Sequence, residues 1–189
     1  MKKLLLPILS LFIFSFALAQ EKRVGYSIDL TPFVGTWEYR TENELFKVML
    51  VKGKIDNSLA MFDCILGGYY YQKDGQVIAD YLSPIPAVSD FTINGGSKII
   101  ACAFSYDQSR IAEYAPDYLF VTYFDDKKEG KSSGEGSSIT LLTYNTIKWE
   151  LKEGERWIIK DRNGNYLEGH EPKPEGFSVP TNVVLTKVE

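Results

Sequence analysis

Two-residue turn signals recur along this chain, and they restrict the fold more than any other feature. Asp74-Gly75, Asn94-Gly95 and Asn163-Gly164 each follow or precede runs that are rich in aromatic and β-branched residues. Such pairs tolerate the positive φ angles of the tight turn that joins two antiparallel strands. No segment shows a convincing amphipathic-helix pattern, and a parallel sheet would need helical crossovers. The sequence therefore predicts antiparallel strands joined by short turns.

The C-terminal third gives the most regular strand pattern. Ile147, Trp149 and Leu151 alternate with charged residues, which is typical of a strand buried on one face. Val183 to Val188 reads as a closing strand. Because an open sheet of such apolar strands would expose pairing edges, closure is favoured. We expect residues 20–189 to form one all-β domain, a single antiparallel up-and-down barrel of about eight to ten strands.

Three segments have the composition of connections. Lys52-Gly53-Lys54 predicts a loop. The stretch from Asp125 to Ser138 is charged and rich in glycine and serine, so we expect an exposed, mobile hairpin loop there. Glu21 to Asp29 is short of core residues, and it is either a flexible tail or a lid strapped across one end of the barrel.

Residues 1–19 have the pattern of a cleaved secretory signal. Two lysines precede an apolar run from Leu4 to Leu18, and Ala17-Leu18-Ala19 supplies the small residues of a cleavage site. We expect the mature chain to begin at Gln20 and to be exported, to the periplasm or to the extracellular space. No later apolar run approaches the length of a membrane span, so we expect none after the signal is removed.

Cys64 and Cys102 are the two cysteines of the chain. An exported protein meets oxidising conditions, so one reading is a disulfide between them. The other reading is two buried free thiols, because both cysteines stand in apolar strand-like runs. Spacing alone does not decide between these readings, because a disulfide depends on three-dimensional geometry.

The opening Leu30-x-x-Phe33-x-Gly35-Thr36-Trp37 resembles the start of lipocalin-like proteins. In that family a short helical turn leads into a Gly-x-Trp at the head of the first strand. The resemblance implies a lipocalin-like barrel in which Gly35 and Trp37 form one closed end. It also implies a basic side chain from a late strand over the tryptophan, a place that Lys187 would take.

A second resemblance spans nearly the whole mature chain. Phe33-Val34-Gly35-Thr36-Trp37 and the ending from Phe177 to Lys187, a Phe-x-x-Pro-Thr-x-x-x-x-Thr-Lys pattern, are similar to a family of small exported bacterial proteins. That family is an uncharacterised domain of unknown function. The resemblance implies export and gives no activity.

The chemistry-bearing residues do not form a recognisable catalytic or metal-binding pattern. His170, with Glu168 or Glu171, could serve a metal or acid–base role, but a lone histidine in a proline-rich stretch is more often solvated. Asp161 to Asn165 faintly resembles a calcium loop, and a hairpin turn explains it better. No nucleophile elbow or phosphate-binding loop is present. We therefore expect no enzymatic activity, no catalytic residues, no metal and no cofactor.

The net charge and the apolar and aromatic residues indicate which kinds of partner this protein could bind. The formal charge of −4 does not attract a phosphate backbone, so nucleic acid is not expected. Leu59 to Leu66 and Leu119 to Phe124 are apolar on both faces, which suggests a small apolar or amphipathic ligand in the barrel mouth. The sequence does not identify the ligand-binding residues. The alternative is a module that binds an envelope or extracellular protein, such as an inhibitor or assembly factor, through exposed tyrosines and the stretch from Asp125 to Ser138.

Overall fold

The computed structural model describes residues 21–82, 97–154, 161–166 and 174–188. The expected signal segment, the Asn94-Gly95 turn, and His170 with Glu168 and Glu171 lie outside these ranges. In the described ranges, no helix has both the length and the apolar character needed to cross a membrane.

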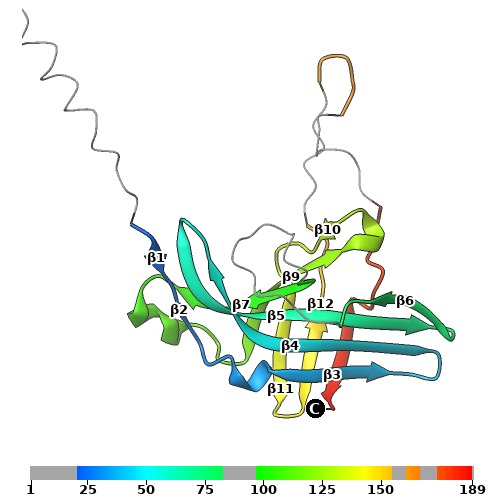
Figure 1. Ribbon diagram of the computed structural model, residues 1–189, viewed down its shortest axis with the longest axis horizontal. Helices are drawn as coiled ribbons and strands as arrows, with labels where there is room; N and C mark the ends of the chain where they lie inside the picture. Colours follow the sequence, from blue (N-terminus) through cyan, green and yellow to red (C-terminus); the bar gives the residue numbers. More distant parts are fainter. Residues whose placement is uncertain (1–20, 83–96, 155–160, 167–173, 189) are drawn as a thin grey trace, which may run out of the picture.

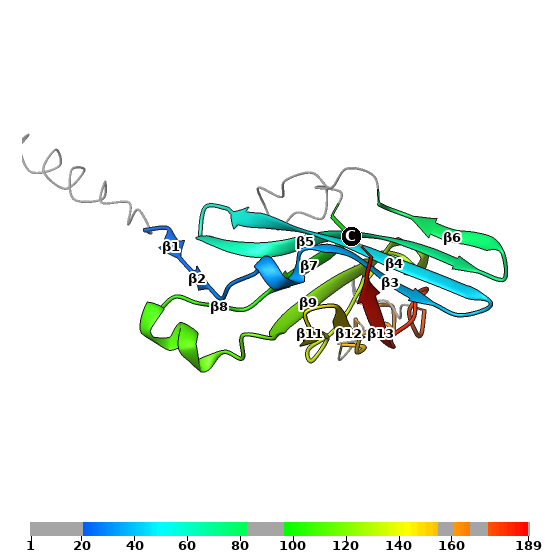
Figure 2. The same ribbon diagram turned by 90° about the horizontal axis from the view of Figure 1, so that it is seen from below.

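Eight antiparallel strands close into a barrel (Figure 1), as the sequence predicted. They are β3 (Gly35–Arg40), β4 (Glu44–Asp56), β5 (Ala60–Lys73), β7 (Ile99–Cys102), β9 (Tyr118–Asp125), β11 (Ser138–Thr143), β12 (Thr146–Glu150) and β13 (Asn182–Lys187). Each strand pairs with the next in this order, and β13 returns to β3 through Thr186 opposite Glu38 and Lys187 opposite Trp37. Figure 2 shows β3 to β5 passing across β11 to β13. Because the barrel is closed, its first strand, β3, pairs with its last strand, β13.

Shorter elements decorate the barrel. Five short strands, β1 (Arg23–Val24), β2 (Tyr26–Ser27), β6 (Gln76–Asp80), β8 (Phe104–Ser105) and β10 (Lys131–Ser132), extend or flank it. Three 3-10 turns, η2 (Thr31–Phe33), η4 (Gln108–Glu113) and η5 (Asp126–Lys128), connect strands.

The β4–β5 and β5–β6 hairpins test two of the turn predictions. Asp74 and Gly75 have φ angles of 49° and 77°, so the predicted tight turn between β5 and β6 is confirmed. The predicted loop at Lys52-Gly53-Lys54 is wrong, because β4 continues to Asp56 and these residues pair with β5. Pairing within the β4–β5 hairpin overrides their loop-like composition.

Large side chains fill the barrel interior. Trp37, Phe46, Tyr69, Tyr123 and Trp149 are all fully buried. Their rings pack edge-on or tilted: the Phe46 and Trp149 centroids are 5.8 Å apart, and those of Tyr123 and Trp149 are 6.0 Å apart. Burying aromatic surface of this size is the main source of stability in the barrel.

A second hydrophobic cluster lies on the outer face of the sheet. It is built on β4, β5, β7 and β9 by Ile55, Ala60, Phe62, Cys64, Leu66, Ile100 and Phe124. Because neighbours along a strand point to opposite faces, one set of β5 residues enters the barrel and the other enters this outer cluster. The two-faced apolar pattern of β5 and β9 therefore corresponds to two hydrophobic clusters, one on each face of the sheet.

The stretch from Asp125 to Ser138 is not a free loop, which corrects the expectation from composition. It contains η5 and β10, and β10 pairs with the end of β9. Asp125, Lys131, Ser137 and Ser138 are buried, although residues between them are exposed. Asp125, Lys131 and Ser137 can be buried because their polar groups form hydrogen bonds with other parts of the chain.

Candidate functional site

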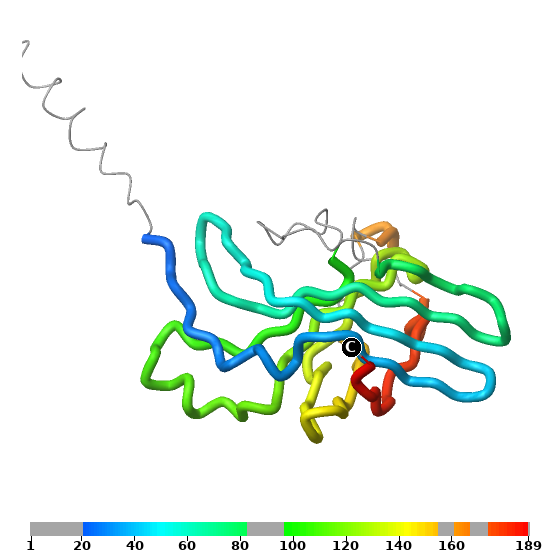
Figure 3. Tube along the Cα trace, turned by 60° about the horizontal axis from the view of Figure 1, so that its bottom comes forward, coloured from blue at the N-terminus to red at the C-terminus, as the bar shows by residue number. Residues whose placement is uncertain are grey.

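Residues 22–30, called the strap below, cross the outside of one barrel end. Arg23 and Val24 pair in parallel with β5, whereas Tyr26 and Ser27 pair antiparallel with β8. Figure 3 shows the strap in blue, passing near the far end of the β4–β5 hairpin before the chain enters β3. Of the two sequence readings for Glu21 to Asp29, the strapped lid is the one observed, from Lys22 onward.

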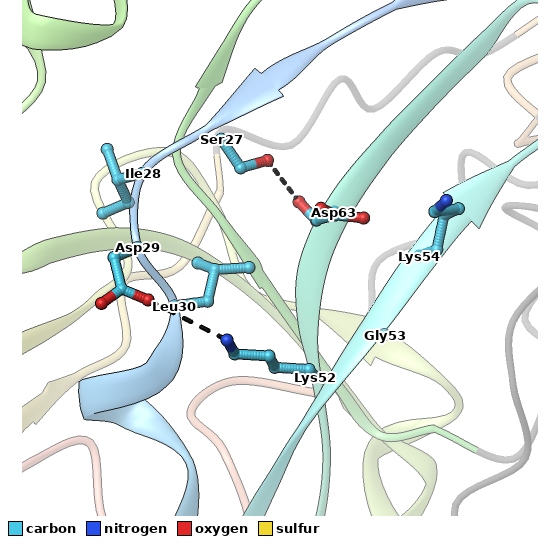
Figure 4. A pocket seen from close by; sticks show the side chains of 8 residues that line it. All are labelled: Ser27, Ile28, Asp29, Leu30, Lys52, Gly53, Lys54 and Asp63. Carbon is cyan, nitrogen blue, oxygen red and sulfur yellow. Dashed lines mark hydrogen bonds and ion pairs between the residues drawn. The ribbon is translucent and has the colours of Figure 1, made fainter.

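A cleft of about 390 Å³ lies between the strap and the β4–β5 hairpin (Figure 4). It is lined by Ser27, Ile28, Asp29 and Leu30 from the strap, by Lys52, Gly53 and Lys54 from β4, and by Asp63 from β5. The three charged residues of the hairpin share a sheet face with the barrel interior, because they keep its alternation past Leu50. The cleft therefore continues the inner face of the barrel beyond its end.

Two sets of contacts hold the cleft walls together. Lys52 Nζ donates to Thr31 Oγ1 at 2.7 Å and lies 3.9 Å from Asp29 Oδ1, while Ser27 Oγ donates to the Asp63 carbonyl oxygen at 2.8 Å. Hydrogen bonds from the Thr31 hydroxyl and backbone N–H, with Lys52 nearby, lower the pKa of Asp29. Both contacts join the strap to the hairpin, so they set the width of the opening.

The remaining charged groups of the cleft are available to a ligand. Lys54 and Asp63 stand opposite each other in the β4–β5 register, yet neither side chain has a hydrogen bond or ion pair among the described residues. Leu30 is buried and Ile28 half-buried, so the floor is apolar while the rim is charged. The lining contains no histidine or cysteine, and it offers binding groups rather than an activated nucleophile.

The residues that the opening motif singled out lie at the end of the barrel where the chain enters β3. Gly35 has a φ of 137°, which L side chains rarely adopt, and Trp37 donates its indole N–H to the Phe33 carbonyl at 2.9 Å. The Lys187 Nζ lies 5.2 Å from the centre of the Trp37 ring. The basic side chain expected over the tryptophan is therefore present, on β13.

Sequence reasoning missed a buried polar cluster at the opposite end. Asp125 is fully buried and accepts hydrogen bonds from the Ser178 backbone N–H at 2.6 Å and from its hydroxyl at 2.7 Å. Lys131 is 4% exposed, donates to the carbonyls of Pro174 and Gly176, and lies 3.0 Å from Glu153. These bonds fix the chain that leads into β13. The pairing spans about fifty residues of sequence, so composition does not reveal it.

Tyr69 and Tyr123 place two unbonded hydroxyls inside the barrel. Both side chains are fully buried, and their ring centroids are 5.3 Å apart. Burial raises the pKa of both hydroxyls well above the usual range, and each also shifts the other. Even so, neither hydroxyl makes a hydrogen bond of normal geometry within the described residues.

We expect Tyr69→Phe and Tyr123→Phe each to raise the free energy of unfolding by about 1 kcal/mol, because each removes a buried unbonded hydroxyl. Urea unfolding followed by tryptophan fluorescence measures the change. Tyr144→Phe, at an 81% exposed position, is the control and should change nothing. Loss of stability in both core variants would mean that the hydroxyls are bonded after all, to internal water for instance.

The structure also places the calcium-loop candidate and the two cysteines. Asp161 accepts hydrogen bonds from the backbone N–H groups of Asn163 and Asn165, and Gly164 has a φ of 85°, so the stretch is a tight turn closed on its own carboxylate. Cys64 and Cys102 are thiols on the neighbouring strands β5 and β7. In the described ranges, no three histidine, cysteine or acidic residues are grouped as metal ligands.

Comparison with known proteins identifies a family for this chain. The sequence profile of a family of unknown function, DUF6705, matches residues 1–188. Neither the curated proteins nor the solved structures contain a match. The chain therefore belongs to DUF6705, in agreement with the resemblance to an uncharacterised family.

Proposed function

We propose that this member of DUF6705 is an exported, non-enzymatic barrel protein that binds a small amphipathic molecule in the cleft beneath the strap. The cleft itself carries the proposal. Its volume of about 390 Å³ falls in the range typical of small-molecule sites, and it combines an apolar floor with a few charged groups. The proposal therefore places the ligand on this flank of the barrel, where the described residues form a cleft.

The lining favours a ligand with an anionic head. An apolar body would lie over Leu30 and Ile28 and along the methylene stem of Lys52, which is already held by Asp29 and Thr31. The head would meet the Lys54 ammonium, which has no ion-pair partner among the described residues. The carboxylate of Asp63, on the facing strand, would repel an anionic head group that reaches across the cleft.

Support for export comes from the sequence. The basic start, the apolar run and the small residues at 17–19 match a secretory signal, and a carrier of amphipathic molecules would act where such molecules cross aqueous space. N-terminal sequencing of the protein purified from its own host tests the processing step. A mature chain that begins at Gln20 agrees with export.

Lys54→Met tests the site, because methionine keeps an apolar side chain and removes the charge. With anilinonaphthalene sulfonate as the probe, we expect the dissociation constant to rise about fivefold, which corresponds to about 1 kcal/mol for one partly exposed ion pair. Fluorescence titration of the purified mature protein, with competition by dodecanoate, measures the affinity.

Lys127→Met is the matched control, since it makes the same charge change on η5, outside the cleft. Its probe affinity should equal that of the unmodified protein. Equal losses in both variants would mean that the probe responds to net charge alone. Unchanged binding in Lys54→Met would place the ligand elsewhere and refute the cleft assignment.

The alternative of a protein-interaction module rests on exposed side chains. Tyr144 is 81% exposed, and Leu59, at the tip of the β4–β5 hairpin, is 59% exposed. These residues are scattered on the surface, and single exposed apolar residues are common in proteins. Native mass spectrometry of protein from its own host separates the two functions, because it distinguishes a bound small molecule from a bound protein.

A further inference from the structure

Cys64 and Cys102 each lie one residue beyond the last ladder pair of β5 and β7, where the two strands part. Ile65 pairs with Ala101 and Leu66 with Ile100, so the same register places Cys64 opposite Cys102. Beyond this point the strap enters between the strands: Ile28 N–H donates to the Ala103 carbonyl. The two cysteines therefore mark the fork at which the sheet opens to admit the strap.

Their backbone groups point away from each other. Phe124 N–H donates to the Lys98 carbonyl, and since bonding direction alternates along a strand, Cys102 directs its backbone groups toward β9. Asn57 N–H donates to the Ala60 carbonyl, so the backbone groups of Ala60 point toward β4. Cys64 lies four residues later on the same strand, and its backbone groups therefore also point toward β4. Within a regular ladder, a facing pair of this non-hydrogen-bonded kind has Cα atoms about 4.5 Å apart, which is inside the range that disulfides span.

The side chains share one face of the sheet. Both belong to the outer hydrophobic cluster, Cys64 fully buried and Cys102 half-buried at its edge. Burial raises the pKa of Cys64 to about 12 and that of Cys102 to about 11, and the nearby Cys102 contributes to the shift at Cys64. At neutral pH both thiols are therefore mostly protonated, and they react with an external disulfide slowly, through the small fraction present as thiolate.

We propose that Cys64 and Cys102 form a disulfide that ties β5 to β7 at this fork. The reaction is exchange with an external disulfide. The more accessible Cys102, as its thiolate, forms a mixed disulfide and releases one external thiol; Cys64 then displaces the second. Two S–H bonds are lost, one protein S–S bond forms, and the external disulfide is reduced to two thiols. The bond encloses residues 65–101.

The test treats the purified, reduced mature protein with oxidised glutathione and then blocks free thiols with N-ethylmaleimide. We expect a mass lower by two hydrogen atoms, no maleimide adduct, and a linked peptide pair containing both cysteines. The melting temperature should rise by about 10 °C relative to the reduced protein. The Cys102→Ala variant is the control and should show no such rise.

Two outcomes would overturn the disulfide. One is labelling of both cysteines after glutathione treatment, and the other is a stable glutathione adduct on Cys102, which would show that Cys64 does not reach it. The experiment does not depend on where the protein resides, nor on a bound molecule. Its failure is thus separate from any failure of the proposed export or of the cleft.

Discussion

Replacing Trp37 with alanine lowers the free energy of unfolding by about 3–5 kcal/mol, the largest single effect that we expect in this chain. The indole is fully buried, bonds to the Phe33 carbonyl and packs beneath Lys187. Its removal leaves a cavity at the barrel end and an unpaired buried carbonyl. Chemical unfolding monitored by far-ultraviolet circular dichroism measures the loss without using tryptophan emission.

Two variants separate the causes of that loss. Trp37→Phe keeps an aromatic ring but removes the indole N–H, and it should recover more than half of the stability lost in Trp37→Ala. Lys187→Met removes only the cation over the ring and should cost about 0.5–1 kcal/mol. A Trp37→Ala protein as stable as the unmodified one would contradict the contribution of the Trp37 contacts to stability.

The second large effect is expected at Asp125. Asp125→Ala leaves the partly buried backbone N–H and hydroxyl of Ser178 without their acceptor, and the backbone N–H of Lys127 also loses its acceptor. We expect a loss of about 3 kcal/mol, because hydrogen bonds to a charged group contribute about 1.5–3 kcal/mol each and the losses are not fully additive. Thermal and urea unfolding of the mature protein measure it.

The neighbouring Asp126→Ala is the control, since Asp126 is partly exposed and pairs with Lys98 at the surface. It should cost less than about 1 kcal/mol. Asp125→Asn keeps one oxygen acceptor, so its loss in free energy of unfolding should lie between those of Asp126→Ala and Asp125→Ala. Equal effects at 125 and 126 would mean that the Ser178 contacts contribute nothing to stability.

Local signals predicted most of the fold. The Asp74-Gly75 pair defined its turn without help from the rest of the chain, since positive φ angles are a local requirement. The alternation through Ile147 and Trp149 placed one face of β12 in the core. Closure between β3 and β13 followed from the general cost of exposed edges rather than from any particular residue.

The candidate cleft and the polar cluster depend on partners distant in sequence. Lys52 and Lys54 have loop-like composition, and only their pairing with β5 makes them strand residues that line a cleft. Asp125 and Lys131 also have the composition of a surface loop. They are buried because residues 174–178 bring matching donors and acceptors. A single sequence gives the residue types at such sites but not the distances between them.

The seam between β3 and β13 has a consequence for how the polypeptide acquires its structure. Two ladder pairs and the hydrogen bond from Val188 N–H to the Thr36 carbonyl join these strands, which are the first and the last strands of the barrel in sequence. Contacts of such high sequence separation form late, because a long stretch of chain must be ordered first. During synthesis, β3 therefore presents an unsatisfied edge until the final strand has emerged. Truncation before Asn182 would make that edge permanent and should cause the shortened product to self-associate.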